Sequence, residues 1–145
     1  EIERRHIADL PQQLAAELGV DCAVIFSFQG GRAIPMATKL PPGQRLAAFV
    51  PEGNGAVATV FRTGAAARID SYERLGIDRM AHVARAGSYR SSVAAPIIVD
   101  DAMWGAILVA TTADEAIARG AEAILTRAAG EIAAEAAQTS VLVPA

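Results

Sequence analysis

The sequence predicts an α+β fold in a single domain, with a helix near each end of the chain and an antiparallel sheet between them. Two segments, 2–18 and 114–138, carry apolar residues at helical spacing. The segments between them are short apolar runs separated by glycine, proline and aspartate, which is typical of strands joined by turns. With 145 residues, of which 52% are hydrophobic, the chain is long enough to bury a core.

The amino-terminal segment 2–18 is predicted to be a leader helix that ends at Gly19. Its apolar stripe consists of Ile7, Leu10, Leu14 and Leu18. Pro11 interrupts this stripe, because its ring clashes with the carbonyl group four residues earlier. We therefore expect either a kink at this point or a new helix start with Asp9 as the N-cap.

Short strands and a short helix are expected next. Residues 21–28 and 32–39 are predicted strands that Gly30–Gly31 connect in a tight hairpin. Residues 66–70 form a further short strand.

The middle of the chain also carries helix-capping signals. Asn54 as N-cap and Gly64 as C-cap predict a short helix over residues 55–63. Asp70 and Glu73 fit a capping box that would start another helical segment.

The most apolar stretch is segment 90–112, which we interpret as a hairpin that turns at Asp100–Asp101. A half-exposed strand would alternate apolar with polar residues, but here both faces are apolar. On the first strand, Val93, Ala95, Ile97 and Val99 point one way and Ala94, Pro96 and Ile98 the other. On the returning strand, Met103, Ile107 and Val109 point opposite to Trp104, Ala106 and Leu108. Both faces of this hairpin must therefore be covered.

The carboxyl-terminal segment 114–138 is predicted to be a long, alanine-rich closing helix. Its apolar stripe consists of Ile117, Ala121, Ile124, Ala128, Ile132 and Ala136. A narrow stripe rich in alanine suits close approach of another helix, so we expect two copies of the chain to pair through their terminal helices. The alternative is a monomer in which both helices use their whole apolar faces on their own sheet.

Charge and composition exclude several classes of function. The formal net charge of −3 and the pI of about 5.3 argue against nucleic acid, which needs a basic face. No apolar run reaches the roughly 20 residues that a bilayer requires, so we expect no membrane span. The single cysteine, Cys22, suggests a reducing compartment, and we expect a cytoplasmic protein. Because the chain begins at Glu1 rather than methionine, we expect it to be a piece of a longer protein.

Catalytic motifs do not emerge from the sequence, and we expect no enzymatic activity. Asp100–Asp101 are adjacent turn residues whose side chains point apart. Nothing in the spacing of Ser92, His82 and Asp70 supports a catalytic triad. The turn at 53–55 lacks the Lys-Ser/Thr pair of a phosphate loop. Two histidines and one cysteine do not make a metal cluster.

Two stretches together resemble a GAF domain: GNGAVATVFRTGAAARID at 53–70 and RSSVAAPIIVDDAMWGAILVATT at 90–112. The most specific parts are Thr63–Gly64, Arg68–Ile69–Asp70, Arg90–Ser91–Ser92, Pro96 and Trp104–Gly105. GAF domains are small-molecule sensor modules of bacterial sensor kinases, phosphatases, cyclases and transcription activators. The resemblance implies an antiparallel sheet of five or six strands, with terminal helices on one face. Loops and short helices on the other face would form a pocket.

The same resemblance implies which residues line this pocket. Matching the Trp–Gly pair to bilin-binding relatives puts four residues of the hairpin on the pocket side: Ser92, Ala94, Leu108 and Ala110. The first strand would add Val24, Phe26 and Phe28. A lid from segment 71–89 would contribute Met80, His82, Val83 and Tyr89. Alternatively these residues fill a core. The hydroxyl groups of Ser91 and Ser92 are suited to a ligand carboxylate or amide, or to the backbone.

The resemblance leaves the cofactor open. Haem-binding members use a histidine from the same variable region, so His82 is a candidate haem ligand, with an ordinary surface or core histidine as the alternative. Cys22 is not at a bilin-attachment position, so we expect no covalent bilin. The Asn-Lys-Phe-Asp-Glu pattern of cyclic-nucleotide-binding members is missing. The branch that reduces free methionine sulfoxide needs several cysteines, which this chain cannot supply.

We therefore expect a ligand-sensing regulatory GAF domain of a bacterial two-component system, in the first place of a sensor histidine kinase. A small molecule would bind non-covalently, and the terminal helices would relay binding to an output domain of the same longer chain. The alternative is a degenerate GAF domain with a filled pocket that serves as a dimerisation element or spacer. The single domain, 1–145, would consist of a leader helix (1–18), sheet and pocket segments (19–112) and the closing helix (114–138).

Overall fold

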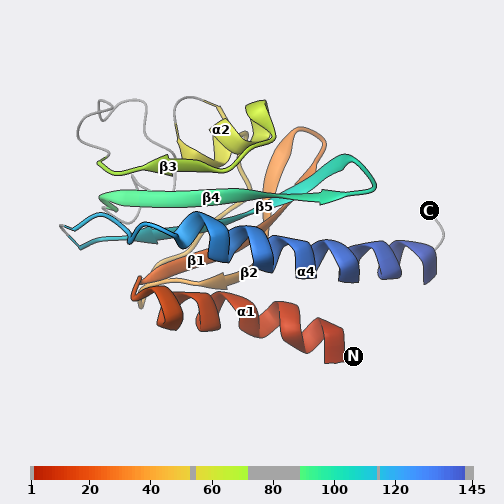
Figure 1. Cartoon of the computed structure of the whole chain (residues 1–145), viewed down its shortest axis with the longest axis horizontal. Helices are drawn as coiled ribbons and strands as arrows, with labels where there is room; N and C mark the ends of the chain where they lie inside the picture. Colours follow the sequence, from red (N-terminus) through yellow and green to blue (C-terminus); the bar gives the residue numbers. More distant parts are fainter. Residues whose placement is uncertain (1, 53–54, 72–88, 114, 143–145) are drawn as a thin grey trace.

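The computed structural model describes residues 2–52, 55–71, 89–113 and 115–142. In chain order its elements are α1 (Ile2–Leu18), β1 (Cys22–Gln29), β2 (Arg32–Lys39), α2 (Ala56–Thr63), β3 (Ala67–Ile69), β4 (Ser91–Val99), β5 (Ala102–Thr111) and α4 (Ala121–Leu142). Figure 1 shows α1 and α4 running side by side along one face of the sheet. The start of α1 and the end of α4 lie at the same end of the molecule (Figure 1).

The strands form one five-stranded sheet in the order β2-β1-β5-β4-β3. All neighbouring strands are antiparallel, which confirms the predicted architecture. Gly30 and Gly31 both have positive φ angles, of 59° and 76°, as a tight hairpin turn requires. Asp100 and Asp101 also have positive φ angles, of 51° and 67°, and they form the turn predicted between β4 and β5.

Successive residues of the strands contribute to two hydrophobic clusters on opposite sides of the sheet. The face under α1 and α4, here called the helix face, buries Ala23, Ile25, Val93, Ala95, Ile97, Ile107 and Val109 against Leu10, Leu14, Leu125 and Ile132. The opposite face carries the predicted ligand residues of the strands and is here called the ligand face. It buries Val24, Phe26, Ala94, Ala106, Leu108 and Ala110 against Phe49, Val57 and Val60. The prediction that both faces of the hairpin are covered is confirmed.

The start of β5 departs from the predicted alternation. The register of β4 with β5 shifts between Ile97 and Ile98, so that Trp104 has no partner across the ladder. Such a bulge reverses the side to which the preceding residues point. Met103 therefore packs on the ligand face and Trp104 on the helix face, opposite to the prediction.

The glycine that follows the bulge is required by close packing between strands. Gly105 lies beside Ser27 of β1. A Cβ atom at Gly105 would overlap the backbone carbonyl of Phe26, which cannot move without breaking the ladder. The Trp104–Gly105 pair thus combines a bulge with a close approach of two backbones.

Helix α1 is continuous through Pro11, so of the two expected alternatives the new start at Asp9 does not occur. Leu10, Pro11 and Leu14 are all buried against the sheet. This burial offsets the backbone hydrogen bond that proline cannot donate.

The short middle elements agree with the sequence except at their limits. Helix α2 has Gly55 as its N-cap, with extended backbone and no capping side chain, instead of Asn54. Gly64 is the predicted C-cap, with a φ of 72° and its N–H bonded to the carbonyl of Val60. Strand β3 is two residues shorter than predicted. Asn54 and Glu73 lie outside the described residues.

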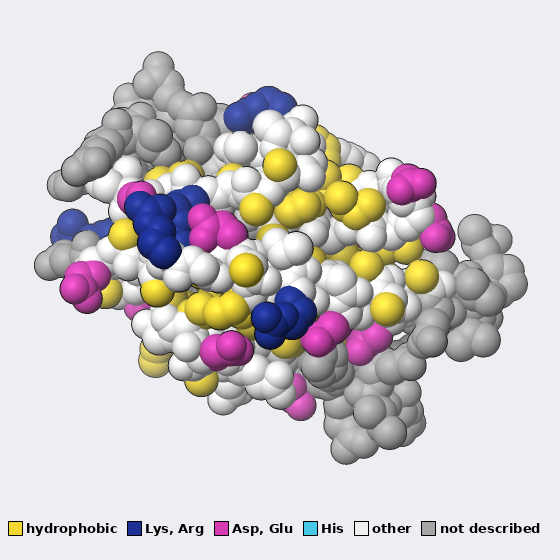
Figure 2. Space-filling model, in the orientation of Figure 1, with side chains coloured by type: hydrophobic (Ala, Val, Ile, Leu, Met, Phe, Trp, Pro, Cys, Tyr) yellow, Lys and Arg dark blue, Asp and Glu magenta, His cyan; other side chains and the backbone are white. Residues whose placement is uncertain are grey.

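Helix α4 begins at Ala121, well after the predicted start at residue 114. Gly120 has a φ of 96°, which is incompatible with a right-handed helix. The carbonyl groups of Ile117 and Ala118 accept hydrogen bonds from the side chain of Arg68, and that of Ala118 also accepts one from the N–H of Ala121 at 3.3 Å. Basic and acidic side chains gather next to one another over this start of α4 (Figure 2).

The buried stripe of α4 also differs from the prediction, since Ala129 is buried although it was not expected in the stripe. Leu125 is completely buried, although it was not expected in the stripe, and Ile124 is only half-buried. The other predicted positions, Ile117, Ala121, Ala128, Ile132 and Ala136, are buried as expected.

Candidate ligand-binding site

The predicted ligand residues of the three central strands lie together on the ligand face. One row across the sheet runs through Val24, Leu108, Ala94 and Ala67. The next row runs through Cys22, Ala110, Ser92 and Ile69. All predicted members of these rows are buried, and Phe28, at the end of β1, is half-buried. The sheet therefore brings together the strand residues that the resemblance to GAF domains grouped.

Small side chains occupy the centre of this face. Ala67, Ala94, Ala106, Ala110 and Ser92 come from three neighbouring strands, β3, β4 and β5. Larger side chains surround them on β1. Phe26 contacts Phe49 edge-to-face, with ring centroids 5.5 Å apart, and Phe28 contacts Phe61 in the same way at 4.8 Å. The face thus carries small side chains on β3, β4 and β5, with the larger Leu108 and Ile69 among them, and aromatic rings on the β1 side.

The polar groups identified on this face are uncharged at neutral pH. Tyr89 is 4% exposed, and its hydroxyl group donates a hydrogen bond to Oε1 of Gln44 at 3.1 Å. Burial raises the pKa of Tyr89 well above its ordinary value. Burial also raises the pKa of the Cys22 thiol to about 11, so little thiolate forms at neutral pH.

The two adjacent serines of the hairpin point to opposite faces. Ser92 is fully buried on the ligand face, beside Ala110 and Ile69. Ser91 shares the helix face with Val93, and its Oγ has no hydrogen-bond partner among the described residues. Of the two serines, only Ser92 therefore lies on the predicted side, where its hydroxyl group could hydrogen-bond a ligand.

Three predicted lid residues, Met80, His82 and Val83, lie outside the described residues. Within the described ranges, no group of three or more histidine, cysteine or acidic side chains is arranged to hold a metal ion. The described helices include none that is long and apolar enough to cross a bilayer.

The family model of the GAF domain matches residues 8–136. The chain belongs to the GAF domain family. GAF domains are small-molecule sensor and regulatory modules of signalling proteins. None of the curated proteins compared with the chain matches it significantly.

Solved structures similar to this GAF domain come from several kinds of protein. The GAF domain of an Acinetobacter phosphoenolpyruvate-protein phosphotransferase is 17% identical, with a TM-score of 0.74, over 97% of this chain and 93% of its own. The phycocyanobilin-bound GAF domain of a cyanobacterial phytochrome is 18% identical, with a TM-score of 0.75, over 100% and 89%. A type II free methionine-R-sulfoxide reductase from Thermoplasma acidophilum is 14% identical, with a TM-score of 0.77, over 92% and 91%. At these identities the likeness shows a shared fold.

Sequence reasoning missed several residues of the ligand face of this GAF domain. Cys22 precedes Val24 by two positions, so strand parity could have found it. Ile69 joins the face only through the pairing of β3 with β4. Phe49 and Gln44 lie in an irregular segment, where no periodic pattern indicates direction.

Proposed function

We propose that this GAF domain is a ligand-sensing regulatory module that binds a small molecule non-covalently on the ligand face. The observation that carries the proposal is the group of small residues around Ser92, on the sheet face away from α1 and α4. Small side chains at the centre of a face leave room for a ligand, and a buried hydroxyl group can orient it. The bound phycocyanobilin of the phytochrome GAF domain supports a ligand in this fold.

The chemistry of the face favours an apolar ligand with an uncharged polar group. The described side chains around the alanines are aliphatic or aromatic, with Ser92, Tyr89 and Gln44 as polar neighbours. The high pKa of Cys22 disfavours covalent attachment through its thiol, since the thiolate is the reactive form. The proposed role is therefore binding rather than catalysis.

The second candidate function is a GAF domain whose ligand face is filled by its own side chains. Phe49, Val57 and Val60 already pack on this face from the middle segments, and this packing favours the second candidate. Such a domain would act as a dimerisation element or spacer. The two candidates differ in whether the space above Ala94 accepts additional atoms.

Native mass spectrometry of the freshly purified chain tests the proposal. We expect a mass above that of the polypeptide under native conditions, which disappears on denaturation. Ala94→Leu should abolish the additional mass, because the larger side chain occupies the ligand space. Ala16→Leu makes the same change on the exposed surface of α1 and should retain it. An unmodified polypeptide mass in every sample would count against ligand binding.

We further propose that the terminal helices relay binding to an output domain, with a sensor histidine kinase as the expected context, and that two copies pair through them. The large apolar residues of α1 and α4 already cover the sheet, so pairing would use the outer face of α4. Ala123, Gly130 and Ala134 are exposed there, and nothing lies within 4 Å of a Cβ built at Gly130. Small residues permit close helix approach.

Sedimentation at tens of micromolar protein tests this pairing. A dimer has twice the chain mass of 15.0 kDa. Gly130→Glu should return it to a monomer, because the carboxylate would be placed between the helices. A single species of 15.0 kDa for the unmodified chain would reject the pairing.

A further inference from the structure

Strand β3 connects the two faces of the sheet through three consecutive residues. Ala67 and Ile69 lie on the ligand face, next to Ala94 and Ser92 of β4. Arg68, between them, points to the other face, where it reaches the segment before α4. One short edge strand thus contacts both the proposed ligand site and the start of the closing helix.

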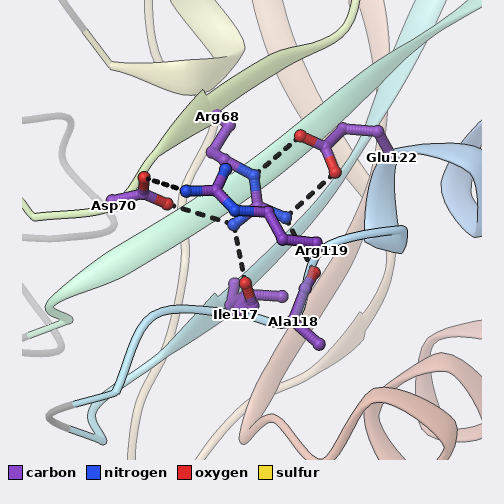
Figure 3. Close-up of polar contacts among 6 residues, drawn as sticks. All are labelled: Arg68, Asp70, Ile117, Ala118, Arg119 and Glu122. Atoms are coloured by element: carbon purple, nitrogen blue, oxygen red, sulfur yellow. Dashed lines mark hydrogen bonds and ion pairs between the residues drawn. The ribbon is translucent and has the colours of Figure 1, made fainter.

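The guanidinium group of Arg68 uses all of its hydrogen-bonding capacity in this position (Figure 3). Nε and Nη2 donate to the two carboxylate oxygens of Glu122, at 2.7 and 2.9 Å. Nη1 donates to Asp70 at 3.1 Å and to the carbonyl of Ile117 at 2.6 Å. Nη2 also donates to the carbonyl of Ala118 at 2.8 Å. A guanidinium group has five N–H donors, so none is left over.

These acceptors define where α4 begins. The carbonyl group of Ile117 would accept a hydrogen bond within the helix if α4 started earlier. The carbonyl group of Ala118 accepts the N–H of Ala121 at 3.3 Å beside the hydrogen bond from Arg68. Glu122 lies in the first turn, where a carboxylate also stabilises the helix dipole. The side chain of Arg68 is only 10% exposed, so water competes weakly for these contacts. The hydrogen bond from Arg68 lowers the pKa of Glu122 to about 2, so the pair stays charged at neutral pH.

We infer that Arg68 couples the occupancy of the ligand face to the start of α4. The inference rests on the function proposed above. A ligand beside Ile69 displaces β3, and Arg68 moves with it because the two residues are neighbours in a three-residue strand. A planar guanidinium fork that donates to five acceptor atoms of four residues cannot shift and keep all its hydrogen bonds. The first turn of α4 therefore changes its stability, and α4 carries the change to the end of the molecule where α1 starts (Figure 1).

Hydrogen exchange of the whole chain, followed by mass spectrometry, tests the first half of this route. In Arg68→Gln we expect the amides of residues 121–125 to exchange about tenfold faster, as for the loss of a charged hydrogen bond. Arg68→Lys should give a smaller increase, since an ammonium group cannot replace the fork. Arg119→Gln removes a cation that is 77% exposed and binds only Asp70 among the described contacts, and should change nothing in α4. A uniform increase over β1, β5 and α4 would overturn the inference, because Arg68 would then be a general stabilising residue.

A double-mutant cycle tests the second half, from the ligand face to Arg68. Ile69→Ala should also accelerate exchange of residues 121–125, and it should add nothing in the Arg68→Gln chain. Ile34→Ala, the same truncation at a half-buried residue of β2 on the opposite edge of the sheet, is the matched control and should leave the start of α4 unchanged. If the effects of Ile69→Ala and Arg68→Gln on the exchange of residues 121–125 are additive, Ile69 does not act on α4 through Arg68. If Arg68→Gln does not fold, Arg68→Lys replaces it in the cycle.

This test needs no ligand, so it separates the two proposals. If native mass spectrometry detects a retained ligand but the cycle shows no coupling, only the proposed role of Arg68 is rejected. Coupling in the cycle, with no retained ligand, leaves the route from β3 to α4 established and rejects the small-molecule site.

Discussion

Successive residues of each strand point to opposite faces of the sheet, and the two faces are built from different kinds of side chain. The helix face interlocks large branched residues of the strands, Ile25, Ile97 and Ile107, with Leu125 and Ile132 of α4. The ligand face has alanine and serine at its centre, under the short helix α2 and irregular segments. The helix face thus packs large strand residues against two long helices, whereas the ligand face packs smaller strand residues against short segments.

The largest expected effect is a difference in the loss of stability between truncations at two adjacent residues. Ile107→Ala on the helix face should destabilise the fold by about 4 kcal/mol, because the long helices cannot collapse into the cavity. Leu108→Ala on the ligand face should lose only about 2 kcal/mol, since short segments can relax around it. Urea denaturation followed by circular dichroism measures both values. Equal losses would mean that the two faces are packed alike.

The converse substitution, from small to larger, gives a smaller effect. Ala95→Val lies under α4 and should lose about 1–3 kcal/mol through overpacking. Ala94→Val, on the opposite face, should change the stability by less than about 0.5 kcal/mol if there is room above it. A loss at Ala94 as large as that at Ala95, again from urea denaturation, would favour the filled GAF domain.

The smallest of the three expected effects on stability is that of acid. Low pH should weaken the contacts of the helix face more than those of the ligand face. Arg68 lowers the pKa of Glu122 to about 2, so the stabilisation is fully present above about pH 4.5 and is lost as the pH falls toward 2. Solvent reduces it to less than about 1 kcal/mol, because the Glu122 carboxylate is 35% exposed.

Melting temperatures between pH 2 and 6 measure this loss. Glu122→Gln should show a shallower decline with falling pH. The decline should not vanish, because Arg68 also lowers the pKa of Asp70, which Arg119 contacts as well. An unchanged slope in Glu122→Gln would show that other carboxylates govern acid stability.

The resemblance to GAF domains selected the residues of the candidate site, and strand parity agrees with that selection. Val24, Ser92, Ala94 and Leu108 are separated by even steps within their strands, and the alternation of side chains puts them on one face. Parity failed at Trp104, where a bulge inserts one residue and reverses the pattern.

Strand parity also cannot predict the direction of side chains where the chain forms no regular strand. Phe49 and Gln44 contribute to the ligand face from a segment without periodic structure. The pairing of Ile69 with Ser92 joins residues far apart in the sequence, and no local pattern specifies such a pairing.

The sequence by itself determined the features that depend on neighbouring residues. These are the glycine and aspartate turns, the capping glycine at Gly64, the apolar strands and the family to which the chain belongs. Only the tertiary structure decided where α4 begins. Its alanine-rich sequence favours a helix from residue 114, but Arg68, 49 residues before Ile117, binds the carbonyl groups that such a helix would use. Long-range hydrogen bonds of a buried guanidinium group override local helix propensity, because propensities amount to only tenths of a kcal/mol per residue.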